Sequence, residues 1–82
     1  MAVVLLPGLL AAQAGGESRF EVHGVTLGEA LRELPVADLL LDEHGAVRPL
    51  VNVYVDRERV TDLGAALAPD ASVRVVAAIA GG

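Results

Sequence analysis

The sequence predicts an α+β domain in which a mixed sheet of four to five strands curls over one main helix. Residues 2–6, 18–23, 50–56 and 71–79 show the apolar runs or the alternation of apolar and polar residues that strands require. Between them, residues 26–34 have the spacing of an amphipathic helix. With 82 residues, the chain forms one domain with one small core, which leaves little room for an internal active site.

The first two strands are expected to form an antiparallel pair. Phe20 and Val22 have the parity that faces the core, and the polar residues beside them point outward. Pro7-Gly8 and Gly15-Gly16 interrupt the chain between the two strands. Because glycine and proline disrupt regular structure, we expect a loop there.

A secretory signal is the alternative interpretation of residues 1–16, because an apolar run there precedes a small-residue segment that looks like a cleavage site, Ala12-Gln13-Ala14. The positively charged start of such a signal is missing, and Pro7-Gly8 interrupts the apolar run. We therefore expect residues 2–6 to be a strand and the protein to be cytoplasmic, with no membrane partner.

The clearest helix signal begins at Thr26. Glu29 follows three residues later, so the two side chains can satisfy backbone groups at the helix start as a capping box. Four apolar residues then share one face of the helix: Leu27, Ala30, Leu31 and Leu34. Pro35 ends the helix. Gly28 destabilises it by about 1 kcal/mol relative to alanine, so packing on the sheet must hold it.

The second half of the chain alternates turns and strands. Residues 36–41 are expected to form an irregular turn or short helical piece that tucks residues 39–41 under the sheet, followed by a polar turn at residues 42–45. In the next strand one parity faces the core: Val51, Val53 and Val55. Residues 56–59 predict a tight hairpin with a short edge strand, and Asp62 can cap a compact turn before the last strand.

Charge and composition exclude several classes of function. Six arginines, with no lysine, stand against eleven acidic residues, and the net charge is −5. Nucleic acid is a poor partner for such a surface, whereas a basic docking surface on a partner protein suits it. The absence of cysteine excludes a disulfide framework, a thiolate zinc site and a cysteine nucleophile.

The sequence contains no catalytic or metal-binding motif. His23 falls on the outward face of a strand and His44 in a polar turn, and neither has the spacing of a metal site. A solvated turn explains the carboxylates of Asp38, Asp42 and Glu43. A P-loop, a nucleophile elbow and a dinucleotide fingerprint are all missing. We expect no bound metal or cofactor, and no catalysis by the chain alone.

The last strand leads into a glycine pair. One parity of this strand can face the core (Val73, Val75, Ala77 and Ile79), and the other points outward (Ser72, Arg74, Val76 and Ala78). Ala80-Gly81-Gly82 then spans about 10 Å when extended, and its two glycines have no Cβ to obstruct entry into a narrow cleft. A frayed terminus is the alternative.

Three stretches of the chain resemble the β-grasp sulfur carriers: residues 50–56, 62–67 and 77–82. These carriers are small ubiquitin-like proteins of molybdenum cofactor, thiamine and cysteine biosynthesis. The resemblance implies a ubiquitin-like β-grasp domain at residues 1–79, with its last strand parallel to the first in the middle of the sheet. It also implies a flexible tail at residues 80–82.

The chemistry of these carriers follows from the same resemblance. An E1-like adenylyltransferase uses ATP to activate the terminal glycine carboxylate, which becomes a thiocarboxylate and passes its sulfur to a sulfur-accepting synthase or large subunit. Here the reacting residue would be Gly82, and Gly81 would give the tail clearance in the enzyme. Two alternatives are a ubiquitin-like modifier conjugated through Gly82 to target lysines and an interaction module with an inert tail.

A partner must also recognise the globular body. The candidates for this docking face are the outward residues near the tail: Ala80, Ala78, Val76, Arg74 and Tyr54, with Leu50 and Arg48 as further candidates. Parity does not separate docking residues from core residues here. The pathway is also open, because the length and the Ala-Gly-Gly ending suit the small subunit of molybdopterin synthase, whereas residues 51–55 resemble the cysteine-biosynthesis carriers.

Overall fold

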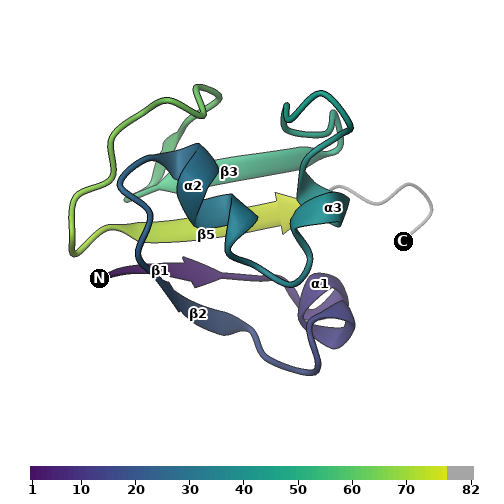
Figure 1. The fold of residues 1–82 in the computed structure, drawn as a ribbon. Coiled ribbons are helices and arrows are strands. Elements are labelled where there is room, and N and C mark those ends of the chain that lie inside the picture. Colours follow the sequence, from purple (N-terminus) through teal and green to yellow (C-terminus); the bar gives the residue numbers. More distant parts are fainter. Residues whose placement is uncertain (78–82) are drawn as a thin grey trace.

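A computed structural model describes residues 1–77, which form a five-stranded mixed sheet with three short helices (Figure 1). The strands are β1 (Ala2–Leu5), β2 (Arg19–Val22), β3 (Val51–Val55), β4 (Glu58–Arg59) and β5 (Ser72–Ala77), in the spatial order β2-β1-β5-β3-β4. The central strand β5 is parallel to β1 and antiparallel to β3, while β2 and β4 are antiparallel edge strands. This topology confirms the α+β class and the central, parallel placement of the last strand.

The alternation along β5 distinguishes the two faces of the sheet. Val73 and Val75 are buried, whereas Ser72, Arg74 and Val76 are exposed. The buried side, which we call the covered face, packs against α2 (Leu27–Arg32) and α3 (Ala37–Leu40), which lie over the sheet in Figure 1. The opposite side, which we call the open face, carries the outward residues of the strands.

The predicted capping box at the start of α2 is present. The Glu29 N–H donates to Oγ1 of Thr26 at 3.2 Å, and the Glu29 carboxylate accepts from the N–H of Val25 at 3.0 Å. The carboxylate therefore reaches one residue further back than the usual partner of a capping box. The predicted apolar stripe is buried at all four positions: Leu27, Ala30, Leu31 and Leu34.

Gly28 is explained by the loop that crosses the start of α2. The N–H groups of Leu27 and Gly28, which have no partner inside the helix, donate to the carbonyls of Ala65 and Leu63 at 2.9 and 2.8 Å. A Cβ on residue 28 would lie 3.1 Å from the Leu63 carbonyl oxygen. The helix-weakening glycine thus allows the loop to approach, and Asp62 caps that loop by accepting from the Gly64 N–H at 2.9 Å, as predicted.

The end of α2 is fastened to the end of β2 through Glu33. Its carboxylate accepts from the N–H of His23 at 2.9 Å and from the N–H of Gly24 at 2.6 Å. These charge-assisted bonds satisfy two backbone donors beyond the edge strand. They connect the helix to the sheet at a point where the chain leaves regular structure.

The expectation of a loop between β1 and β2 was wrong, because this segment contains α1 (Gly8–Gln13). Leu10 and Ala11 of this helix are buried in the core. Gly15 and Gly16 end it with φ angles of 77° and 91°, and the Gly16 N–H donates to the Ala11 carbonyl at 2.8 Å. The glycine pair was therefore a helix stop signal, which we interpreted only as a loop marker.

Residues 36–41 form the expected short helical piece, with one correction. Val36, Leu40 and Leu41 are buried, but Leu39 is 41% exposed. Val36 and Leu40 are four residues apart and so share a face of α3, which turns Leu39 away from the core. Leu40 and Leu41 are therefore buried as predicted, whereas Leu39 is not.

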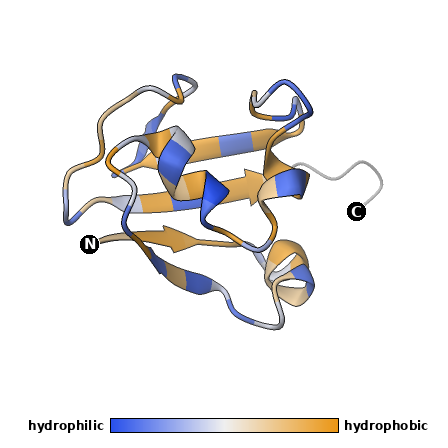
Figure 2. Ribbon diagram, in the orientation of Figure 1, coloured by the Kyte–Doolittle hydropathy of each residue, from blue (hydrophilic) through white to orange (hydrophobic). Residues whose placement is uncertain are grey.

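The core of the described residues is wholly apolar, and apolar segments follow the strands in Figure 2. No polar or charged residue within residues 1–77 is buried. The same part of the chain contains no helix long and apolar enough to cross a membrane. The charged groups therefore lie where a partner could reach them.

Candidate functional site

Three predicted docking residues, Tyr54, Arg74 and Val76, come together on the open face. Tyr54 on β3 and Arg74 on β5 are paired directly across the two strands, and Val76 lies two residues further along β5. Residues paired in this way have Cβ atoms about 4.5–5.5 Å apart. Arg74 and Val76 are exposed and Tyr54 is half-buried. These three residues are therefore surface rather than core, which parity alone had left open.

The three residues line an open depression of about 640 Å³, together with Asp56, Arg57 and Ser72. Small-molecule sites usually enclose most of their ligand. An open depression lined by an aromatic ring, guanidinium groups and an aliphatic side chain suits contact with a protein surface instead.

The hairpin between β3 and β4 forms one wall of this depression. Asp56 and Arg57 have φ angles of 50° and 76°, the left-handed values that a two-residue type I′ hairpin requires. Asp56 also fastens the hairpin to β5, because its carboxylate accepts from the Ser72 N–H at 3.0 Å and its N–H donates to the Ser72 carbonyl at 2.9 Å. The sequence indicated the hairpin, but no local signal indicated its connection to Ser72.

The two further docking candidates differ from each other. Leu50 is 57% exposed just before β3 and stays available to a partner. Arg48, in contrast, donates from Nε and Nη2 to the Asp38 carbonyl at 3.2 and 3.0 Å. Arg48 therefore holds the chain before β3 against α3, and its place at the rim of the docking face stays a prediction.

No protein-family model matches the sequence, and no curated protein does. Solved structures do match it over almost the whole chain. A chain of the BexX/CysO complex from Amycolatopsis orientalis is 26% identical with a TM-score of 0.85, and all of both chains is covered. CysO from Mycobacterium tuberculosis is 27% identical with a TM-score of 0.83, over 96% of this chain and 100% of that chain. SAMP1 from Haloferax volcanii is 26% identical with a TM-score of 0.76, over 99% and 98% of the two chains.

The chain has the ubiquitin-like β-grasp fold, and the structures that it matches are sulfur carriers and ubiquitin-like modifiers of the type that its residues resemble. The resemblance seen in the sequence is thereby confirmed, as is the fold class. The predicted site comprises a reacting terminus and a docking face, and the described residues contain three of the docking candidates, Tyr54, Arg74 and Val76.

The carrier's predicted reacting residues, Gly81 and Gly82, lie outside the described residues, as do the docking candidates Ala78 and Ala80. The predicted boundary between the domain and its tail lies there too. The roles assigned to these residues stay predictions. The described part of β5 leads directly to them.

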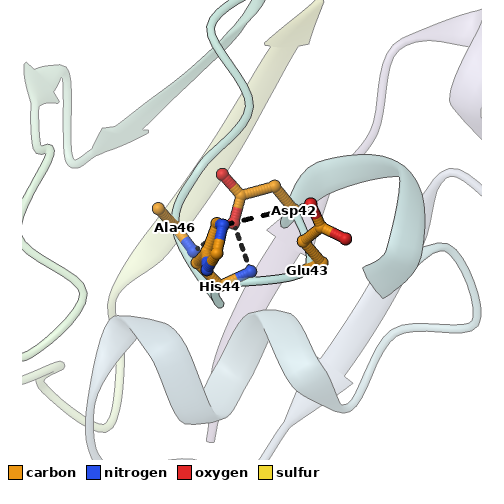
Figure 3. Close-up of polar contacts among 4 residues, drawn as sticks. All are labelled: Asp42, Glu43, His44 and Ala46. Atoms are coloured by element: carbon orange, nitrogen blue, oxygen red, sulfur yellow. Dashed lines mark hydrogen bonds and ion pairs between the residues drawn. The ribbon is translucent and has the colours of Figure 1, made fainter.

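The polar turn at residues 42–45 was also correctly predicted, and it is structural (Figure 3). One oxygen of the Asp42 carboxylate accepts from the N–H groups of Ala46 and His44, at 3.0 and 2.8 Å. These two hydrogen bonds, with that of Ala46 the larger influence, hold the pKa of Asp42 below its ordinary value. His44 lies 3.9 Å from the exposed carboxylate of Glu43. Within residues 1–77 no group of three potential ligands is placed to hold a metal ion.

Proposed function

We propose that the protein carries sulfur on Gly82, whose carboxylate an E1-like adenylyltransferase activates with ATP. The observation that carries this proposal is the exposed Tyr54–Arg74–Val76 surface, built on the strand that leads to Gly82. The fold is shared with CysO and SAMP1 over nearly the whole chain. A docking face beside a side-chain-free terminus is the arrangement that such a transfer needs.

The chemistry explains why activation must come first. A carboxylate resists attack by sulfur because its negative charge repels the nucleophile and oxide is a poor leaving group. In the activating step an oxygen of the Gly82 carboxylate attacks the α-phosphorus of ATP, and pyrophosphate leaves. Hydrosulfide from the sulfur donor then attacks the acyl carbon of the adenylate, and AMP leaves. The product is a thiocarboxylate in which one sulfur has replaced one oxygen.

The chain contributes docking and presentation to this reaction, and the partner enzyme supplies the catalytic groups and binds ATP. The second partner is a synthase, or its large subunit, that takes the sulfur. We place this chemistry in the cytoplasm, together with the activating enzyme. Among the three pathways we favour cysteine biosynthesis, because residues 51–55 resemble its carriers and two of the matching structures contain CysO.

A second candidate function is conjugation of Gly82 to lysines of other proteins. The likeness to SAMP1, a small archaeal modifier protein, supports it. Conjugation would use the same adenylate but transfer the acyl group to an amine in place of sulfur. Isolation from cells separates the two, because a carrier yields a thiocarboxylate and a modifier yields a ladder of heavier conjugates.

The direct test uses the full chain with its cognate activating enzyme, ATP and a sulfur donor. The intact mass should rise by the difference between sulfur and oxygen, and the change should map to the C-terminal peptide. A matched control appends one residue after Gly82, which displaces the reacting carbon by about 3.5 Å and should abolish loading. Modification of an internal carboxylate, or equal loading of the control, would contradict the proposal.

A further inference from the structure

One row of side chains crosses the open face from edge to edge. Direct pairing in the sheet places five residues in a line, one from each strand: Arg19, Leu5, Arg74, Tyr54 and Arg59. Paired residues project from the same face, so the three arginines alternate with a leucine and a tyrosine. We call these five residues the arginine row.

The guanidinium groups of the row are not used to hold the fold together. Arg19, Arg59 and Arg74 are exposed, and none of them forms an ion pair or a side-chain hydrogen bond with a described residue. Arg48 differs, because both of its hydrogen bonds go to the Asp38 carbonyl. The arginines of the row therefore remain available to a partner.

Charge is segregated between the two sides of the molecule. The row contains three of the six arginines, and Glu21 is the one acidic residue on the outward positions of β1, β2, β3 and β5, while Asp56 of the hairpin lines the same depression as Arg74 and Tyr54. Residues 27–45, which form α2, α3 and the following turn, contain five carboxylates and one arginine. With five negative charges against one positive, the helical side accounts for −4 of the net charge of −5, whereas the row itself presents three cations.

The spacing of the row selects among the shapes that a partner could present. Neighbouring strands lie about 4.8 Å apart, so successive arginines are separated by about 9.6 Å. A helix repeats the same face every seven residues, or about 10.5 Å. A strand repeats its face about every 6.6 or 13.2 Å, which fits the row less well.

We propose that the arginine row binds an acidic amphipathic helix of a protein partner, with carboxylates seven residues apart over the arginines and apolar residues over Leu5 and Tyr54. Apolar side chains between the cations favour such a helix over nucleic acid, whose backbone offers only charge to the row. The inference rests on the proposed function only in assigning the helix to the activating enzyme or the synthase. The partner proposed here is acidic, in contrast to the basic partner surface that the net charge predicts.

The test is a titration of the full-length, ¹⁵N-labelled protein with a helical peptide that carries glutamate every seven residues and leucine between the glutamates. Amide shifts should change in the strands around Leu5, Arg19, Tyr54 and Arg74. The charge reversal Arg74→Glu should weaken the peptide Kd at least tenfold. Arg32→Glu, the same change on the exposed surface of α2, should alter the Kd less than twofold.

Three results would overturn the inference: no shift changes in these strands, equal binding by a peptide with glutamine in place of glutamate, or tighter binding by a single-stranded oligonucleotide. Sulfur loading plays no part in this titration, so the two proposals can fail separately. Peptide binding by a chain that no enzyme loads at Gly82 would refute the proposed function alone. Loading without peptide binding at the row would refute the inference alone.

Discussion

Val75 and Val76 are neighbours of the same residue type, yet they belong to different surfaces. Val75, on the covered face, is 1% exposed, whereas Val76, on the open face, is 40% exposed. The covered face packs against α2 and contains no buried polar side chain within residues 1–77, so its buried residues provide stability. The open face alternates apolar residues with arginines, so its apolar side chains stay exposed to water. A role in stability alone would not explain this exposure. The comparison assigns folding to one face and recognition to the other.

The largest effect expected on the covered face comes from Leu31→Ala. Leu31 on α2 is fully buried, and its truncation leaves a cavity, so unfolding should require about 2–5 kcal/mol less. The matched change on the open face, Tyr54→Ala, removes a larger side chain but should cost only about 1 kcal/mol or less. Chemical denaturation of both variants measures the difference. A larger loss for Tyr54→Ala would show that the open face also belongs to the core.

The adjacent pair Val75→Ala and Val76→Ala gives a sharper comparison, because the atoms removed are identical. Val75→Ala should lower the free energy of unfolding by about 1–3 kcal/mol through lost burial. Val76→Ala should lower it by less than about 1 kcal/mol, mostly through strand propensity. Equal losses at both positions would contradict the division between the faces.

A smaller gain in stability is expected from Arg57→Gly. Arg57 has a φ of 76°, which costs a non-glycine residue about 1–2 kcal/mol, and glycine would relieve this strain. Part of the gain is lost because glycine also gives the unfolded chain more conformational freedom. The net gain should be about 0.5–1 kcal/mol. Arg59→Gly, in the adjacent strand β4, should instead destabilise the protein. Thermal unfolding of the two variants tests whether Arg57 is retained for recognition at the expense of stability.

The smallest effect concerns the Asp42 turn, which belongs to neither face. Its pKa is lowered in the folded state, so the ionised carboxylate stabilises the fold above the ordinary aspartate pKa. This contribution should disappear as the pH falls through the lowered value. The melting temperature of Asp42→Asn should therefore lie below that of the unmodified chain near neutral pH, and the two should converge in acid. A constant difference down to the most acidic pH would contradict this assignment.

The covered face was more predictable than the open face, for physical reasons. Burial imposes periodicity, so the buried stripe from Leu27 to Leu34, which starts on α2 and continues past its end, was assigned correctly from spacing alone, as was the inward parity of Val51 to Val55 on β3. Parity put Tyr54, Arg74 and Val76 on one face of the sheet, but their exposure in the structure was needed to show that this face is surface rather than core. The lateral register that aligns Arg19 with Arg74 and Arg59 has no local signal, because it depends on how distant strands pair.

The features that the sequence analysis missed also lack a local signal in the sequence. Helix α1 is too short to show periodicity, and its only clear marker was the glycine pair at its end. The hydrogen bonds of Arg48 to the Asp38 carbonyl join residues ten apart in sequence, so no local pattern predicted them. Neither helix α1 nor the contact between Arg48 and Asp38 could therefore be predicted from the local sequence.

The most direct test of the account measures melting temperature and sulfur loading on the same two variants. One lacks Gly81 and Gly82, and the other is Val75→Ala. The deletion should melt close to the full chain, because glycines bury almost no apolar area, yet it should accept no sulfur from the activating enzyme. Val75→Ala should melt earlier, yet load fully per folded molecule. Full loading of the chain that lacks both glycines would contradict the account.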